Sequence, residues 1–477
     1  RSNLAKLLPR AARFRTTIAD QKQLHPKISW QTFHRGVPDT EHGYYEYNQS
    51  VSATGKPRPN LWELAHRAGK RVGVGASIGS FPLPDDVDNY AFYLPDPFAP
   101  SETTVPALLE HFQRFNHAAV KHSSRNVRRG GTRRAEALAF LRRLPALGVS
   151  TTTVLKVAAQ LLGERINAAR MVRRRNIQAL MSFDVVFKQI SASRPDVTTV
   201  FINHVAAAMH RYWAAKFVDD YDSNNMPEAW RDTYANEIDQ AMLETDYMLG
   251  RLRAFVRSNP EYSVTVVSSM GQAAIEHEVT RNQLVITDMA AYLGCLGFAR
   301  DDYTQRAGME PEYVIAFKDT ESQRRFCERS ASVDINGEAP YVKCHNATEV
   351  TLQVFQNNVA FDHITVGDRP VPLTEAGLAI EPIQDLAGST AQHVREGCCF
   401  VFDGANDLSV HSNEGQCEDI GRVTATLLSV LGVDLPAYLP EPIPALARAL
   451  EQGVANPFGR TERGRQAGSR SRAATDA

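Results

Sequence analysis

The chain has 477 residues, of which 43% are hydrophobic and 22% are charged, a composition typical of a folded globular protein. Its 53 Lys and Arg residues nearly balance its 54 Asp and Glu residues, which leaves a formal net charge of -1. We therefore expect neither a disordered chain nor a polyanionic partner such as nucleic acid.

No apolar run approaches the roughly 18 residues needed to cross a bilayer, so we expect no membrane partner. The sequence opens on Arg1 without the apolar segment of a secretory signal, a start that a processed or truncated chain would show. The six cysteines have no Cys-x-x-Cys spacing and indicate reduced thiols. These features predict a cytoplasmic protein, with a lost signal peptide as the alternative. Nothing in the sequence indicates an oligomeric state.

The first elements in chain order predict alternating helices and strands. Residues 1–24 have the spacing of a helix followed by a loop. Residues 57–69 combine an early proline with a terminal glycine and predict a helix, which leads into a short apolar strand at 71–76. Two further runs rich in β-branched residues, 196–202 and 262–268, read as buried strands. This order predicts an α/β fold.

The remaining segments predict one α/β domain over residues 1–458 with two insertions. Residues 100–193 are helical and rich in arginine, with long helical spacing from 153 to 187, and 220–258 predict another long helix. The arginines indicate either solvated helix faces or a patch that holds a phosphate-bearing substrate. Residues 318–385 alternate as in strands and predict a β-rich insertion, and the tail at 459–477 is predicted to be disordered.

Residues 24–43 contain the first candidate for catalysis. Ser29 follows Pro26 by three residues and precedes Trp30, and the chain then runs through a Gly-Val-Pro turn at 36–38 to His42-Gly43. A serine hydroxyl needs activation by a base or a metal to act as a nucleophile. The alternative is an ordinary serine of a turn or strand end.

Several motifs follow one another in an order that resembles the alkaline-phosphatase superfamily, in its type I phosphodiesterase and nucleotide pyrophosphatase branch. These motifs are Asn3-Leu4-Ala5-Lys6-Leu7, Pro26-x-x-Ser29-Trp30, residues 36–43, residues 61–74, His393-x-x-Glu396-Gly397 and residues 420–436. The resemblance implies a mainly parallel sheet with helices on both faces and ligands at the carboxyl ends of the strands. It also implies two divalent metals, usually zinc, that activate the Ser29 hydroxyl toward a small phosphorylated substrate.

The sequence departs from this family at the metal ligands. The family's first aspartate would lie upstream of Arg1, and its Ser-Asp-His-Gly motif is replaced by Ser268-Ser269-Met270-Gly271. A thioether such as that of Met270 is unsuited to zinc in a site built from oxygen and nitrogen ligands. If His210 takes the family's histidine position, Ala206 stands where the aspartate should be.

The residues that remain predict one zinc site at most, with His204, His210 and His393 as its ligands. Three imidazoles and an open position are a known zinc set. The alternative for each histidine is a structural role in the core, and His42 is better explained as a hydrogen-bonding residue of its turn.

Two functions follow from these residues. The first is a divergent, metal-dependent hydrolase of phosphoric esters with Ser29 as the nucleophile. The second is a non-catalytic member of the fold that binds a phosphorylated ligand or a partner protein. A sulfatase is not favoured, because Ser29 lacks the Cys/Ser-x-Pro-x-Arg context of those enzymes.

Overall fold

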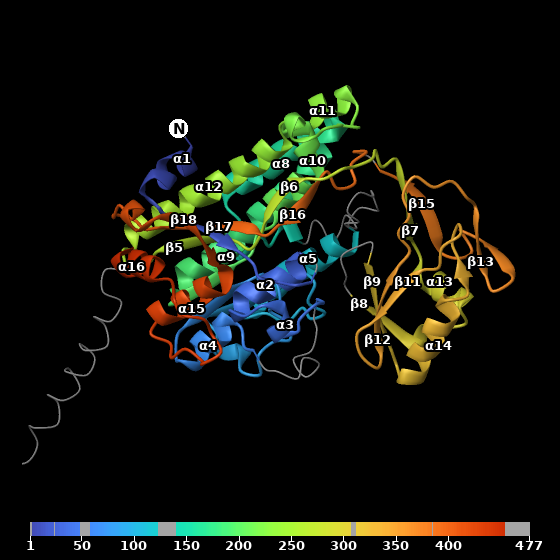
Figure 1. The fold of residues 1–477 in the computed structure, drawn as a ribbon, viewed down its shortest axis with the longest axis horizontal. Coiled ribbons are helices and arrows are strands. Elements are labelled where there is room, and N and C mark those ends of the chain that lie inside the picture. The colour runs from blue at the N-terminus through green and yellow to red at the C-terminus, as the bar shows by residue number, and fades with distance from the viewer. Residues whose placement is uncertain are drawn as a thin grey trace, which may run out of the picture.

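The structure, a computed structural model, describes residues 2–22, 24–47, 58–122, 140–306, 312–383 and 385–453, except for the side chains of residues 118–122 (Figure 1). The predicted disordered tail and the arginines between residues 123 and 139 lie outside these ranges. Within them, no helix has the length and apolar character needed to cross a membrane.

Helices and strands alternate along the chain, which confirms the α/β class. The helices are α1 (Asn3–Leu7), α2 (Pro26–Arg35), α3 (Asp39–His42), α4 (Leu61–Arg67), α5 (Glu110–His122), α7 (Leu144–Leu147), α8 (Thr151–Ile166), α9 (Arg174–Ser193), α10 (His204–Lys216), α11 (Glu228–Tyr234), α12 (Glu237–Ser258), α13 (Met289–Cys295), α14 (Thr320–Ser330), α15 (Ile420–Val430) and α16 (Pro444–Gly453). The strands are β1 (Ala12–Thr17), β2 (Val72–Gly75), β3 (Phe92–Leu94), β4 (Val197–Val200), β5 (Val264–Ser268), β6 (Gly271–Ala274), β7 (Asn282–Ile286), β8 (Tyr303–Arg306), β9 (Glu312–Phe317), β10 (Val333–Asp334), β11 (Tyr341–Cys344), β12 (Glu349–Gln353), β13 (His363–Val366), β14 (Arg369–Pro372), β15 (Leu378–Pro382), β16 (Ala391–Val394), β17 (Glu396–Phe402) and β18 (Asn413–Asp419).

Two sheets lie at the centre of the main body. One has the order β3-β2-β4 and is parallel throughout, and the other has the order β18-β1-β17-β5 and is mixed. Their side chains share one hydrophobic core, in which Phe14 of β1 and Val74 of β2 pack with Trp62 of α4 and Leu428 of α15. The expectation of a mainly parallel sheet is therefore met only in part, because β17 runs antiparallel to both of its neighbours.

The sequence predicts a helix and a loop over residues 1–24, whereas the structure also contains strand β1 there. The helix α1 is short, and β1 then pairs with β17 on one side and β18 on the other. Its alternation was readable: Phe14 and Thr16 are buried, whereas Arg15 between them is exposed. That period of two is the signature of a strand with one face on the core.

Helix α4 and strand β2 confirm the predicted helix and strand at 57–76. The helix begins with a capping box formed by Asn60 and Glu63 and ends before Gly69. Gly69 has a φ of +77°, which glycine adopts without strain because it has no Cβ. All of β2 is buried. Two longer predictions are wrong in detail. The helix expected from 153 to 187 is broken between α8 and α9 at Asn167, and the one expected over 220–258 is divided into α11 and α12.

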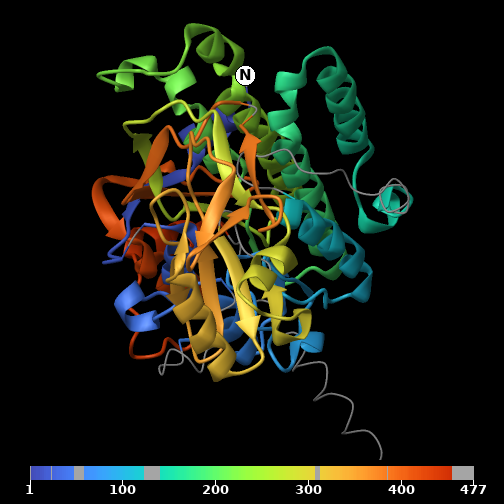
Figure 2. The same cartoon turned by 90° about the vertical axis from the view of Figure 1, so that its right-hand side faces the viewer.

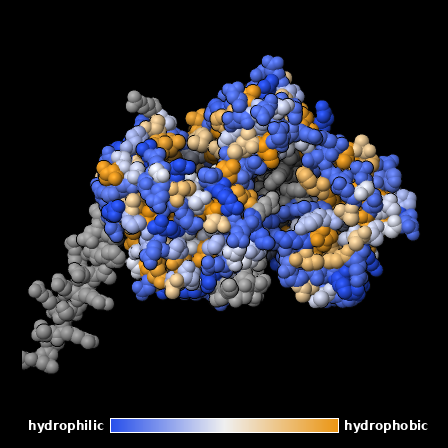
Figure 3. All heavy atoms as spheres, in the orientation of Figure 1, coloured by the Kyte–Doolittle hydropathy of each residue, from blue (hydrophilic) through white to orange (hydrophobic). Residues whose placement is uncertain are grey.

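A second lobe holds strands β7 to β15 with helices α13 and α14 (Figure 1, right). It has a hydrophobic core of its own that runs from Leu284 to Leu378 and includes Phe326 of α14. The predicted β-rich insertion at 318–385 lies within this lobe, which also includes β7, α13 and β8 from earlier in the chain. On the face shown in Figure 3, apolar residues are scattered among hydrophilic ones over both lobes.

Candidate functional site

A cavity of about 290 Å³ opens where the parallel sheet ends. Strands β2, β3 and β4 all direct their carboxyl ends toward it, since Ala76, Pro97 and Phe201 line its wall just after these strands. Ligands of open α/β sheets bind at such ends. The lining residues are His25, Pro26, Tyr47, Ala76, Ile78, Pro97, Phe98, Asn116, Arg175, Gln178, Ala179, Ser182, Phe201, Ile202, Asn203, His204, Ala207, His210, Arg211, Gly388, Ser389 and His393.

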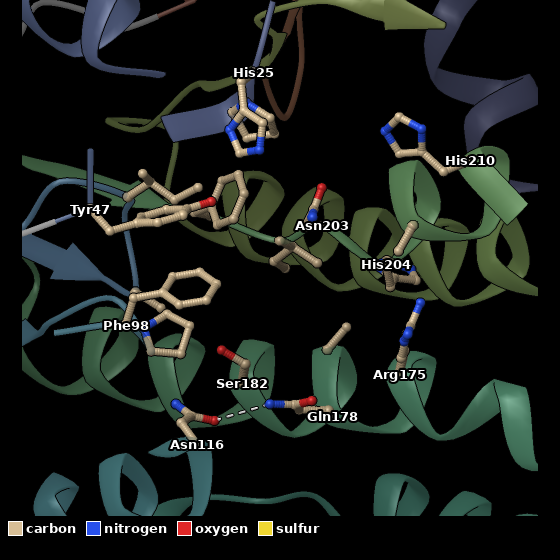
Figure 4. Close-up of a pocket in the computed structure, with 18 of the residues that line it drawn as sticks. His25, Tyr47, Phe98, Asn116, Arg175, Gln178, Ser182, Asn203, His204 and His210 are labelled. Carbon is tan, nitrogen blue, oxygen red and sulfur yellow. Dashed lines mark hydrogen bonds between the residues drawn. The ribbon is translucent and has the colours of Figure 1, made fainter. Parts of the chain in front are cut away.

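The walls of the cavity differ in chemistry (Figure 4). Tyr47 and Phe98 lie together on one side, with their ring centroids 4.3 Å apart in a stacked arrangement. On the other side lie Arg175, His204 and His210. Between the two sides runs a neutral polar wall made of Asn116, Gln178 and Ser182, in which the Gln178 amide donates to Asn116 over 3.5 Å.

The charged and imidazole groups of the lining are all potential cations or hydrogen-bond donors. They are Arg175, Arg211, His25, His204, His210 and His393. Among the described residues that line the cavity there is no aspartate or glutamate. The potential inside a space enclosed in this way favours a negatively charged occupant.

Two helices begin at the cavity. Helix α2 starts at Pro26 after the N-cap residue His25, and α10 starts at His204 after Asn203. Asn203 makes no side-chain capping bond to its helix. The first N–H groups of a helix lack partners within it and carry a partial positive charge, so the start of α10 adds to the attraction for an anion. The start of α2 adds little, because Pro26 has no N–H and the Lys27 N–H donates to the Nδ1 of His25 over 3.2 Å.

His210 and His393 meet in the wall of the cavity, with their Nε2 atoms 3.0 Å apart. The Nδ1 of His210 bonds to the carbonyl of Ala391 over 2.8 Å, and the Nδ1 of His393 bonds to the carbonyl of Leu24 over 3.1 Å. A carbonyl only accepts, so each Nδ1 carries the proton and each neutral ring presents a lone pair at Nε2. Two lone pairs at this distance need a proton or a cation between them, and either one leaves positive charge at this point.

His204 turns its ring away from that pair. Its Nε2 donates to the carbonyl of Ala241 in α12 over 3.0 Å and lies 3.2 Å from the hydroxyl of Thr245. Burial lowers the pKa of His204 to about 4, so the ring is neutral at pH 7. Its Nδ1 is buried and has no hydrogen-bond partner. The described residues contain no group of three His, Cys, Asp or Glu side chains able to hold a metal ion. The structure thus brings two of the three predicted zinc ligands together, and the zinc site stays a prediction.

Arg211 lines the cavity, and its guanidinium is bound by a buried carboxylate. It forms an ion pair with Asp385, which also accepts a hydrogen bond of 2.7 Å from the hydroxyl of Tyr212. The Asp385 side chain is only 2% exposed, and its backbone carbonyl accepts the indole N–H of Trp230. This buried network fixes the position of α10 and with it the position of His210.

Ser29 is buried in α2 and does not line the cavity. Its hydroxyl donates to the carbonyl of His25 over 3.2 Å, a bond typical of a serine inside a helix, and lies 3.2 Å from the hydroxyl of Ser269. Met270, next to Ser269, belongs to the hydrophobic core. Ser29 and Ser269 are therefore neighbours, and Ser29 is not part of the cavity lining to which His210 and His393 belong.

Two polar residues were not singled out by the sequence. His25 is the N-cap of α2 and lines the cavity, and the signal was the following Pro26, which favours the first position of a helix. Asp20 follows β1 by three residues and accepts hydrogen bonds from the Thr32 hydroxyl over 2.7 Å and the Asp39 N–H over 3.1 Å. It was overlooked because β1 was not predicted.

Comparisons with known proteins give little beyond this geometry. No protein-family model and no curated protein matches the chain. Among solved structures, murine ectonucleotide pyrophosphatase/phosphodiesterase 5 is similar over 92% of both chains, with 11% sequence identity and a TM-score of 0.37. A TM-score of this size marks only a partial correspondence of two folds, so the site is interpreted from its own residues.

Proposed function

We propose that the chain binds a small phosphorylated ligand in the cavity at the carboxyl ends of β2, β3 and β4. The observation that carries this proposal is the lining itself, in which Arg175, the pair of His210 and His393 and the start of α10 border the space without a described carboxylate. Phosphate groups are bound by such combinations of arginine and helix N–H groups.

The shape of the cavity adds a second requirement for the ligand. The phosphate would lie on the side of Arg175 and His210, while the rest of the molecule faces Tyr47, Phe98 and the amides of Asn116 and Gln178. That wall offers aromatic surface and neutral hydrogen-bonding groups. An ester whose organic part is polar but uncharged fits this description best.

Hydrolysis of the bound ester is the second candidate function. In its favour is the pair of His210 and His393, two imidazoles that a phosphoric ester in the cavity would contact. The zinc-dependent mechanism predicted from the sequence needs a third ligand and a reachable Ser29 hydroxyl. Ser29 is fully buried and donates its proton to a carbonyl, so binding without turnover has the stronger support.

Thermal unfolding in the presence of ligands tests the proposal. Inorganic phosphate and phenyl phosphate are added to the full chain at rising concentration, with phenol and sodium chloride at matched ionic strength as controls. A ligand that binds only the folded state raises the Tm with its concentration. We expect both phosphates to raise the Tm and phenol to leave it unchanged. Equal effects of phosphate and chloride would refute a specific site.

Turnover is measured on the same samples. Release of phenol from phenyl phosphate and of nitrophenol from bis(4-nitrophenyl) phosphate is followed with zinc added and with chelator. Turnover that is lost in Ser29→Ala would establish the hydrolase and its nucleophile. Binding without release of either phenol establishes the non-catalytic alternative.

A further inference from the structure

Helix α8 presents an apolar face to solvent. Leu155 is 70% exposed, Leu162 is 62% exposed and Ile166 is 86% exposed, and these residues recur at the spacing of one helical face. Val154 and Leu161 flank them at 41% and 51%. In Figure 2 the teal helical arm that contains α8 stands at the edge of the molecule.

The opposite face of α8 is polar and faces the protein. Lys156 forms an ion pair with Glu244 of α12, and Gln160 donates to the carbonyl of Arg170 over 2.6 Å. Glu164 pairs with Arg174 over 2.6 Å and has only 7% of its side chain exposed. A surface helix normally buries its apolar stripe and exposes its polar one. In α8 this order is inverted, which indicates that the outer face is covered by something apolar.

The surroundings of this face are positively charged. Arg165, Arg170 and Arg174 are all exposed around the C-terminal half of α8. Residues 140–175 contain eight Lys and Arg residues and a single acidic residue, Glu164, although the whole chain has a net charge of -1. The Glu164 carboxylate pairs with Arg174 and neutralises that charge, so Arg165 and Arg170 supply the net positive charge beside the apolar face.

We propose that α8 lies on an anionic lipid surface, with its apolar face in the boundary between headgroups and acyl chains and with Arg165 and the nearby Arg170 against the headgroups. A helix with one apolar face and flanking Lys or Arg binds membranes in this way. Its 16 residues span about 24 Å, which suits a helix lying in the interface and is too short to cross a bilayer. The proposal is independent of the function proposed for the cavity and departs from the sequence-based expectation of no membrane partner.

A second copy of the chain is the competing occupant. In a two-fold symmetric contact each surface meets its own copy, so Arg165 and Arg170 would face the same two basic residues of the second copy. Like charges brought together oppose association, whereas anionic headgroups attract the same residues. The charge around α8 therefore favours the lipid surface.

Co-sedimentation of the full chain with vesicles tests this proposal. The vesicles are phosphatidylcholine alone and phosphatidylcholine mixed with phosphatidylglycerol. We expect binding to the mixed vesicles only. The variant Leu155→Gln/Leu162→Gln/Ile166→Gln should lower the partition coefficient by roughly a hundredfold or more, because each side chain loses its transfer into an apolar phase. Arg165→Gln and Arg170→Gln should each lower it about fivefold.

The matched control replaces equally exposed apolar residues elsewhere, as Tyr341→Gln/Phe355→Gln/Val410→Gln. These residues are 57%, 47% and 77% exposed, and the control should bind like the wild type. The thermal unfolding of both triple variants checks that they fold. No binding to mixed vesicles, or binding that survives the α8 substitutions in a folded variant, would overturn the proposal. A dimer that the α8 substitutions dissociate, without vesicle binding, would assign the face to a second copy.

Discussion

The Nε2 atoms of His210 and His393 lie 3.0 Å apart, although the two residues are 183 positions apart in the chain. Carbonyls of Ala391 and Leu24 bond to the Nδ1 atoms of the two rings, so that their Nε2 atoms face each other with a proton or a cation between them. We expect the two histidines to act as a unit in binding a phosphorylated ligand.

The substitutions His210→Gln and His393→Gln should each weaken phosphate binding by about tenfold, because either one removes the positive charge that the pair holds. The double variant should bind no more weakly than the single variants, since additivity fails for residues that act together. Isothermal titration calorimetry measures the three dissociation constants, and the exposed His363→Gln is the control. Additive losses in the double variant would show two independent contacts.

Ser29→Ala should lower the free energy of unfolding by about 1 kcal/mol, because it removes a buried hydroxyl that bonds to His25 and Ser269. Its effect on phosphate binding should stay within about twofold, a difference of only about 0.4 kcal/mol. Urea unfolding of Ser29→Ala, Ser269→Ala and the double variant gives the coupling energy of the two hydroxyls. A loss of ligand binding in Ser29→Ala at unchanged stability contradicts the structural role.

Asp385→Asn should destabilise the chain by about 3 to 5 kcal/mol, because it leaves Arg211 buried without its counter-charge. The same substitution weakens the hydrogen bond from the Tyr212 hydroxyl. Urea unfolding measures the change. The matched control is Asp302→Asn, which breaks a surface pair with Lys318 and should lower the free energy of unfolding far less. Equal costs at the two positions would refute the importance of the buried pair.

Stability should fall in mild acid because of two buried histidines. Burial, with a further contribution from Arg35, lowers the pKa of His34 and of His42 from 6.5 to about 3. Their stabilisation is fully present above pH 6.5. Between pH 6.5 and 3 the unfolded chain takes up protons that the folded chain does not, so stability decreases as the pH falls.

The contribution of Asp20 to the pH dependence of stability has the opposite sign. Burial raises its pKa from 3.8 to about 6, so in the window between these values the folded chain holds a proton that the unfolded chain releases. Burial likewise raises the pKa of Asp96 to about 6 and lowers the pKa of His204 to about 4. With these groups included, three histidines against two aspartates leave a net loss of stability from pH 7 to pH 5. Urea unfolding from pH 7 to pH 5 measures it. His42→Gln should reduce the slope by up to about 1.4 kcal/mol per pH unit. An unchanged slope would mean that His42 titrates normally in the folded chain.

The sequence was most informative where periodicity and end signals agreed. The helix and strand at 57–76 have a capping residue, Asn60, and a terminal Gly69, and both elements occur as predicted. Strand β1 and the antiparallel β17 were not predicted as members of one sheet, because their pairing joins residues almost 400 positions apart. Local patterns contain no information about such a pairing, which depends on burial of both strands in a common core.

For the candidate site, the sequence did not predict which way the candidate side chains face. His210 and His393 meet in the wall of the cavity, whereas His204 lines the cavity but bonds to α12, and Ser29 bonds within its own helix. The first turn of α2 reaches the cavity, and the next turn lies in the protein interior. The spacing of the motif around Pro26 does not show which of the two turns borders a cavity. At the start of α2, the N-cap residue His25, one turn before Ser29, and Pro26 line the cavity.

The central claim is that the cavity binds a phosphate group, and the most direct test compares two adjacent arginines of α9. Arg175 lines the cavity, whereas Arg174 pairs with Glu164 at the surface. Isothermal titration of the full chain with phenyl phosphate should show one site in the wild type and in Arg174→Gln. In Arg175→Gln the affinity should fall at least about tenfold, the loss expected for one charge-assisted hydrogen bond. Equal affinities of the two variants, or no binding to the wild type, would contradict the claim.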